Sequence, residues 1–173
     1  MDITRIYGFP PIANPSASKL ILGSMPGIAS LQADQYYAHP QNAFWKIMGE
    51  LTGAMPALVY AQRLQILQSA GIALWDVVGS CVRPSSLDAH IDKLSIVTND
   101  FSSFFAQHPN IRQVFFNGAK AEQCFKKYVQ NSLSITTLKL QRLPSTSPAN
   151  AGMSYANKLA AWREALQISP PST

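Results

Sequence analysis

Apolar and polar positions follow two different rhythms along the chain. Compact apolar runs that end at glycine or polar residues predict buried strands, and these runs lie at residues 19–23, 72–78, 114–117 and 135–143. Between the runs, apolar side chains recur at helical spacing. This second rhythm predicts helices at 42–53, at 58–70, from residue 99 or 100 onward, at 119–128 and at 154–166.

Short strands that alternate with helices favour a parallel sheet with helices on both faces. We therefore expect an α/β protein with three layers, α/β/α, around a central four-stranded, mainly parallel sheet. Residues 24–41 and 79–92 are predicted loops. Asn42 is expected to cap the helix that follows it, and Gly53 to end that helix.

The carboxyl ends of parallel strands are where ligands bind in such sheets. Segments that follow the predicted strands should therefore meet at one cleft. They are residues 23–27, 76–83, 117–118 and 144–150.

The length of 173 residues predicts a single domain, residues 1–173, with a frayed tail at 169–173. A hydrophobic fraction of 47% rules out disorder and coiled coil. No apolar run is long enough for a membrane span, and the start of the chain lacks the pattern of a signal peptide. We expect a cytoplasmic protein that has no contact with a membrane.

The cysteines and the charges narrow the range of partners. Cys81 and Cys124 are too few for an iron–sulfur cluster or a closed zinc site, so no metal is expected. The net charge of +5 is uneven, because residues 101–173 carry eight Lys and Arg against two Glu. A basic half of this kind suggests a partner that bears phosphates.

Two loops carry chemistry that a hydrophobic core would not need. Residues 35–45 place aromatic rings beside amide groups, which suits a nucleobase because it has a face to stack on and an edge for hydrogen bonds. A packed aromatic cluster under a long loop is the alternative. Residues 144–150 offer hydroxyls and stiffening prolines that could hold a phosphate or wedge into a base stack, although a solvated turn has the same composition.

These motifs, taken together, resemble the uracil-DNA glycosylase superfamily, in particular its mismatch-specific and hypoxanthine (deoxyinosine) branches. The resemblance rests on Gly-Ser-Met-Pro-Gly at 23–27, Tyr-Tyr-Ala-His-Pro-Gln-Asn-Ala-Phe-Trp at 36–45, Gly-Ile-Ala-Leu-Trp-Asp-Val-Val at 71–78, Arg83-Pro, Phe-Asn-Gly at 116–118 and Leu-Pro-Ser-Thr-Ser-Pro-Ala-Asn at 143–150. It implies hydrolysis of an N-glycosidic bond in DNA after the damaged nucleotide rotates out of the helix. No cofactor or metal is implied. No lysine lies inside the motifs, so a monofunctional enzyme is expected.

The resemblance also implies roles for individual residues. Tyr37 matches the aromatic residue that stacks on the flipped base, and Asn117 matches an asparagine whose amide can donate to a keto oxygen and accept from a ring N–H. The other residues expected to bind substrate are Gly23, Met25, Pro26, Gly27 and Ser145. Those expected to contact DNA are Ser147, Pro148, Ala149, Lys120 and Arg142.

The first motif departs from the family pattern. Many relatives carry a carboxylate or an amide in the glycine turn to orient water, whereas Ser24 and Met25 stand here. We expect Asn42 to serve as the catalytic replacement, because its amide oxygen can hold a water, with assistance from Ser24; a plain helix cap is the alternative for Asn42. Leu143 stands where classical uracil glycosylases carry histidine, and His39 is more typical of a structural turn. Asp76 is expected to order the loop that carries Arg83, or else to take part in chemistry.

The sequence therefore predicts a monofunctional DNA glycosylase that acts on deaminated bases, on hypoxanthine first and on uracil or xanthine second. Its expected partner is damaged DNA, as mispaired duplex or single strand, and it is expected to be a monomer. A mismatch-specific uracil glycosylase, a catalytically silent protein that binds damaged DNA, and a small-molecule nucleotide hydrolase remain alternatives.

Overall fold

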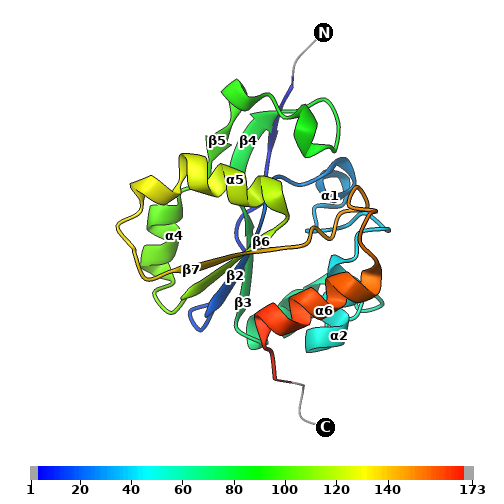
Figure 1. Ribbon diagram of the computed structural model, residues 1–173. Coiled ribbons are helices and arrows are strands. Elements are labelled where there is room, and N and C mark those ends of the chain that lie inside the picture. Colours follow the sequence, from blue (N-terminus) through cyan, green and yellow to red (C-terminus); the bar gives the residue numbers. More distant parts are fainter. Residues whose placement is uncertain (1–3, 170–173) are drawn as a thin grey trace.

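The computed structural model describes residues 4–169 and contains two sheets (Figure 1). The central sheet has four parallel strands in the order β3-β2-β6-β7. Their bounds are Lys19–Gly23 for β2, Ile72–Asp76 for β3, Gln113–Asn117 for β6 and Lys139–Leu143 for β7. This sheet confirms the predicted fold class. The part of the predicted tail that covers residues 170–173 lies outside the described residues.

Helices cover both faces of the central sheet (Figure 1). One face packs against α4 and α5, and the other packs against α2, α3 and α6. Their bounds are Phe44–Thr52 for α2, Tyr60–Ser69 for α3, Phe101–Gln107 for α4, Ala119–Tyr128 for α5 and Tyr155–Leu166 for α6. A further short helix, α1 (Ile28–Ala33), lies inside the predicted loop 24–41.

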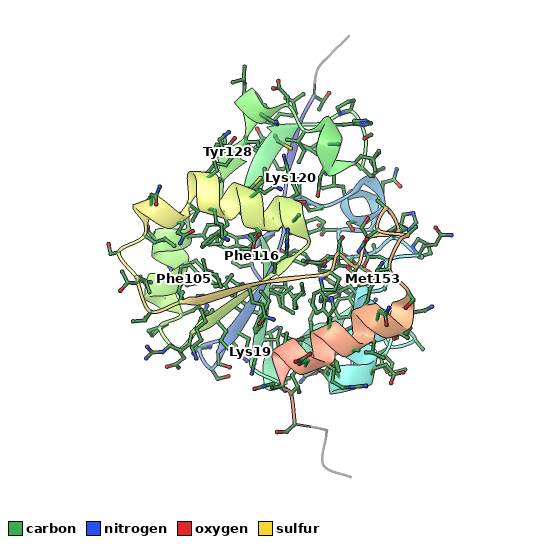
Figure 2. All side chains as sticks on the ribbon, in the orientation of Figure 1. Lys19, Phe105, Phe116, Lys120, Tyr128 and Met153 are labelled. Atoms are coloured by element: carbon green, nitrogen blue, oxygen red, sulfur yellow. The ribbon has the colours of Figure 1, made fainter. Side chains whose placement is uncertain are left out.

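The pleat of the strands divides the core between the two faces. Leu20 and Leu22 of β2 pack on the side of α4 and α5, whereas Ile21 packs on the opposite side. This alternation follows from the period of two in a strand. Phe105 of α4 and Phe116 of β6 belong to the first of these layers (Figure 2). The central residues of β2, β3 and β6 are therefore apolar, because both faces of these strands are buried, whereas the edge strand β7 is mostly exposed and carries polar side chains.

The second sheet was not expected from the sequence. It has the order β1-β4-β5, is antiparallel, and is formed by β1 (Arg5–Tyr7), β4 (Val78–Val82) and β5 (Val97–Thr98). Short 3₁₀ turns at Asp88–His90 and Lys93–Ser95 connect β4 to β5, and a third lies at Gln130–Ser132.

Several predicted boundaries are wrong for physical reasons. The predicted strand 72–78 is divided between β3 and β4, which belong to different sheets. Val77 and Val78 are as buried as the residues of β3, so the hydropathy pattern gives no sign of where one strand ends and the next begins. For the same reason the predicted loop 79–92 begins inside β4. Residues 135–138 lie outside β7, because its ladder with β6 starts only at the pair Gln113 and Lys139. The helix expected at Asn42 begins at Phe44.

Candidate active site

The carboxyl ends of the four parallel strands lie at one edge of the sheet, and hydrogen bonds tie the segments that follow them together. The Val77 backbone N–H donates to the Gly23 carbonyl at 2.9 Å, which links the ends of β3 and β2. The Gly118 N–H donates to the Leu143 carbonyl at 3.1 Å, which links the ends of β6 and β7. The four segments therefore follow strands that end at the same edge of the sheet, as predicted, and the single cleft expected between them stays a prediction.

Gly23 lies at the centre of this edge because two polar side chains approach it closely. A Cβ atom built on Gly23 would lie 2.5 Å from Asp76 Oδ1 and 3.1 Å from the Tyr37 hydroxyl. The first distance is too short for any side chain. Glycine is therefore required here for space, and it allows Asp76 and Tyr37 to meet beside β2.

Asp76 is buried, and its Oδ2 has no hydrogen-bond partner among the described residues. Burial, followed by the nearby Asp88 carboxylate, raises the pKa of Asp76 to about 7, although the Arg83 guanidinium acts in the opposite direction. Asp88 accepts a hydrogen bond from Ser24 Oγ at 2.6 Å, and burial raises the pKa of Asp88 as well. The site therefore holds two carboxyl groups whose protonation changes nearer to neutral pH than is usual.

Arg83 is the cation beside these carboxyl groups. It is 5% exposed and donates from one terminal nitrogen to the Pro26 carbonyl, which anchors the glycine turn to the loop after β4. Its Nε and other terminal nitrogen have no partner within the described part of the chain. Burial lowers the pKa of Arg83, whereas the charge of Asp88 raises it. The charges of Asp76, Arg83 and Asp88 act on one another, but no hydrogen bond or ion pair joins Asp76 to Arg83 among the described residues, so a role of Asp76 in ordering the loop that carries Arg83 stays a prediction.

Tyr37 is held in an unusual backbone conformation. Its φ of 56° lies in the left-handed region that non-glycine residues seldom adopt. The ring stacks on Phe44 with centroids 4.0 Å apart and an interplanar angle of 25°. The hydroxyl is buried without a partner among the described residues, and burial, followed by the Asp76 charge, raises the pKa of Tyr37. The side chain of Tyr37 is thus partly exposed, whereas its hydroxyl is buried.

The Asn117 amide is held by one buried neighbour, Thr146. The Thr146 backbone N–H donates to Asn117 Oδ1 at 2.9 Å, and Asn117 Nδ2 donates to Thr146 Oγ1 at 2.9 Å. The Ala43 N–H in turn donates to the Thr146 carbonyl at 3.0 Å. Thr146 therefore joins the end of β6 to the turn before α2.

Asn42 lies in that turn and is half-buried. Its Oδ1 accepts from the Phe44 N–H at 2.9 Å, so it supports the first residue of α2 even though Ala43 is the formal N-cap. The Ala43 N–H donates to the Thr146 carbonyl, outside the helix. An amide oxygen has two lone pairs, so support of the helix leaves one free to accept from a water.

The other residues expected to bind substrate or DNA surround this edge. Met25 packs into the hydrophobic layer of α4 and α5, and Gly27 is the N-cap of α1. The Cβ of Ser145 would lie 3.0 Å from a Cβ on Gly118, whose φ of 95° also favours glycine. In the loop beyond it, Ser147 is half-buried, whereas Pro148 and Ala149 are exposed.

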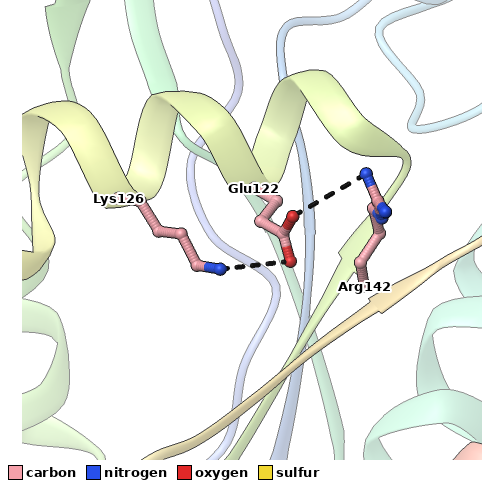
Figure 3. A network of polar contacts seen from close by, with 3 residues as sticks. All are labelled: Glu122, Lys126 and Arg142. Atoms are coloured by element: carbon pink, nitrogen blue, oxygen red, sulfur yellow. Dashed lines mark ion pairs between the residues drawn. The ribbon is translucent and has the colours of Figure 1, made fainter.

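The two predicted DNA-binding cations differ in their surroundings. Arg142 lies 3.9 Å from Glu122 of α5, which also pairs with Lys126 at 3.6 Å (Figure 3). Lys120 lies in the first turn of α5, and its charge lowers the pKa of the neighbouring Asp88. Lys120 thus lies near the polar cluster, whereas Arg142 shares the half-buried carboxylate of Glu122 with another cation.

Sequence comparison decides the family. The family model described as the uracil DNA glycosylase superfamily matches residues 10–167. The chain belongs to the uracil DNA glycosylase superfamily. It is 34% identical over 161 residues to a hypoxanthine DNA glycosylase from Methanosarcina barkeri, with 92% of this chain and 97% of the relative covered. The same enzyme from Methanosarcina acetivorans is 34% identical over 156 residues, with 90% and 94% covered.

A solved structure supports the same family. A solution NMR structure of a candidate uracil DNA glycosylase from Methanosarcina acetivorans superposes with a TM-score of 0.74 at 31% identity, and 95% of this chain and 99% of that one are covered. Among residues 4–169, no group of three His, Cys, Asp or Glu side chains could hold a metal ion. In the same residues no helix is long and apolar enough to cross a membrane.

For three residues of this site the sequence predicts no functional role. Asp88 lies inside the predicted loop 79–92 with no motif around it, so nothing in the sequence signals its contact with Ser24. Arg83 is part of an Arg-Pro pair in the loop that Asp76 is expected to order, and this pattern gives it no role of its own. Thr146 lies inside the Ser/Pro loop, but a threonine between two serines resembles any solvated turn. Its burial at 1% exposure is what distinguishes it.

Proposed function

We propose that this protein is a monofunctional DNA glycosylase that removes deaminated bases from DNA, hypoxanthine first and uracil or xanthine second. The observation that carries the proposal is the 34% identity to two hypoxanthine DNA glycosylases over at least 90% of the chain. The family match over residues 10–167 is consistent with one catalytic domain that spans residues 1–173.

In the proposed reaction the damaged nucleotide is rotated out of the DNA and its base stacks on Tyr37. Unstacking costs a few kcal/mol and less for a mispaired base, which favours damaged positions. The partly exposed ring of Tyr37, fixed from behind by Phe44, supports this role. Asn117 lies at the end of β6, where its amide can form hydrogen bonds with the edge of the base.

Asn42 is proposed to orient the attacking water. Its amide oxygen cannot take a proton at neutral pH, so it positions water and does not act as a base. The water oxygen forms a bond to C1′ of the sugar while the glycosidic electron pair leaves with the base. The water proton is released to solvent, and the base anion takes up a proton. An oxocarbenium-like sugar forms along this path. Ser24 is proposed to assist through its hydroxyl, which donates a hydrogen bond to Asp88.

Pro148, Ala149 and Ser147 are proposed to contact the DNA, together with Lys120 and Arg142. Their support is the exposed loop beside Asn117 and the basic second half of the chain. We further propose that the protein acts as a monomer in the cytoplasm, without metal or cofactor. The two free, buried thiols of Cys81 and Cys124 fit a reducing compartment.

The test is incubation with duplex oligonucleotides that carry one inosine or one uracil, followed by alkaline cleavage at abasic sites. Strand breaks at inosine are expected for the wild type. Asn42→Ala should lower the single-turnover rate by at least about 100-fold, the range seen when one positioned catalytic group is removed. Asn42→Ser keeps an oxygen that can accept from the Phe44 N–H, so loss of activity there separates catalysis from helix support. Asn131→Ala, on an exposed turn, is the control.

Each alternative predicts a different result in this assay. Breaks only at uracil would assign the protein to the mismatch-specific branch. Binding to damaged duplex without breaks at any deaminated base would contradict the enzyme. Hydrolysis of free nucleosides that is insensitive to salt would favour a small-molecule hydrolase.

A further inference from the structure

Thr146 makes three hydrogen bonds to two separate parts of the site. Its N–H and its hydroxyl both engage Asn117, and its carbonyl accepts from Ala43, the residue next to Asn42. It is also 1% exposed, so no solvent competes for these bonds. One buried residue, through its backbone and its hydroxyl, thus links the strand end that would read the base to the turn that would hold the water.

The contact of the Thr146 backbone N–H settles which way the Asn117 amide faces. A backbone N–H can only donate, so the atom opposite it must be the amide oxygen. In the flipped amide, the Nδ2 protons would point at the Thr146 N–H and two donors would be left facing each other. The observed orientation satisfies both groups at 2.9 Å.

This orientation limits what Asn117 can offer to a ligand. Its oxygen is turned toward Thr146, and one Nδ2 hydrogen is given to the Thr146 hydroxyl. The remaining Nδ2 hydrogen is a donor on the side of the Tyr37 hydroxyl. Asn117 also lowers the pKa of Tyr37, which places its amide beside the phenol that would stack on the base.

We propose that Thr146 is a positioning residue that sets substrate specificity by fixing the Asn117 amide with a donor toward the base. The proposal rests on the proposed glycosylase function and deepens it. Hypoxanthine and uracil present a keto oxygen that accepts this N–H. Adenine and cytosine present an amino group at the same place, so two donors would face each other and binding would be weakened. Selection for deaminated bases then follows from the amide orientation.

The experiment compares deoxyinosine with deoxynebularine, the same purine without the keto oxygen, in otherwise identical duplexes. Thr146→Val keeps the shape and removes the hydroxyl acceptor. We expect it to lower the inosine rate by about five- to tenfold, the effect of one neutral hydrogen bond, and to lower the inosine-to-nebularine ratio by the same factor. Thr146→Ser restores the hydroxyl and should restore the ratio. Thr136→Val, at an exposed threonine, is the matched control.

Two outcomes would overturn the proposal. If Thr146→Val slows both substrates equally, the residue has only a structural role. If Thr146→Ser is as impaired as Thr146→Val, the methyl group matters and the hydroxyl does not. Asn117→Ala should abolish the preference for the keto base, and adding Thr146→Val to it should cause no further change in the ratio. A further loss would contradict the coupling.

A spectroscopic measurement keeps this test independent of the proposed function. The side-chain NH₂ signals of Asn117, identified by their loss in Asn117→Asp, should shift in Thr146→Val and stay in place in Thr136→Val. A wild type that is inactive on every deaminated base while these shifts occur would refute the proposed function but not the positioning of Asn117 by Thr146. Unchanged signals would refute that positioning itself.

Discussion

Gly23 shows how far a single residue controls the arrangement of the site. Its missing side chain leaves space that Asp76 and the Tyr37 hydroxyl occupy from two sides. Neither of these groups has its full set of partners among the described residues, and both are buried. A side chain at this position would separate polar groups that come from distant parts of the sequence.

We therefore expect Gly23→Ala to destabilise the protein by about 1 to 3 kcal/mol, the range for overpacking a tight site. The added methyl would lie 2.5 Å from Asp76 Oδ1, so the carboxyl group and Tyr37 must move. Urea unfolding measures the effect. Gly152→Ala is the matched control, because no atom of residues 4–169 outside its own neighbourhood lies within 4 Å of its added Cβ. Equal stability of the two variants would contradict the argument.

Asp76 leads to a prediction about pH. Its pKa is raised from 3.8 to about 7 on folding, so the folded state binds more protons between these values and stability falls as the pH rises through about 7. Asp76→Asn removes the buried charge. Relative to wild type, the variant should gain on the order of 3 kcal/mol between pH 4 and pH 8. The raised pKa of Asp88 acts in the same direction and remains in the variant.

Unfolding midpoints in urea at several pH values measure this gain, with Asp34→Asn at an exposed aspartate as the control. A stability difference between Asp76→Asn and wild type that does not change with pH would contradict the burial of a charge at this position.

At the scale of elements, local signals placed most helices but not the strand ends. Ala119–Tyr128 is α5 as predicted, and Ser154 caps α6 by accepting from the Asn157 N–H at 3.2 Å. Such caps depend on neighbours in the sequence, so the sequence carries them. Where β3 ends and β4 begins depends instead on which strands lie alongside, and hydropathy is the same on both sides.

The cap of α6 is testable because this helix follows the Ser/Pro loop and buries Trp162, whose indole N–H donates to the Pro144 carbonyl at 2.9 Å. Ser154→Ala should lower the free energy of unfolding by about 1 kcal/mol. Ser154→Asp retains a side-chain acceptor and should remain close to wild type. Thermal unfolding compares the three proteins, and a loss of equal size in both variants would exclude the cap as its cause.

At the scale of the whole molecule, charge and strand direction act together. The second half of the chain holds most of the positive charge, and Lys120 lies near the carboxyl edge of the parallel sheet. Lys139 begins β7 and so lies at the opposite edge. The positive net charge favours binding of a polyanion. The topology decides which lysine and arginine side chains lie close enough to the carboxyl edge of the sheet to contact it.

Lys120→Gln is expected to weaken DNA binding uniformly across sequences and to reduce the slope of log K against log salt by about 1. Lys139→Gln removes the same charge from the other edge and should leave the slope unchanged. Fluorescence anisotropy at several salt concentrations measures both. Equal slopes for the two variants would mean that net charge alone, and not the carboxyl edge, governs the contact.

The sequence by itself determined the class of fold, most of the helices and the chain segments that form the site, because apolar periodicity, caps and glycine turns are local properties. It also determined the family, since the motifs lie in the same order along nearly the whole chain. Only the tertiary structure decided that Asp88 contacts Ser24, that Thr146 holds Asn117, and that residues 72–82 divide between two sheets. These contacts join residues far apart in the chain. Burial and the direction of hydrogen bonds select them, and neither can be seen in a linear pattern.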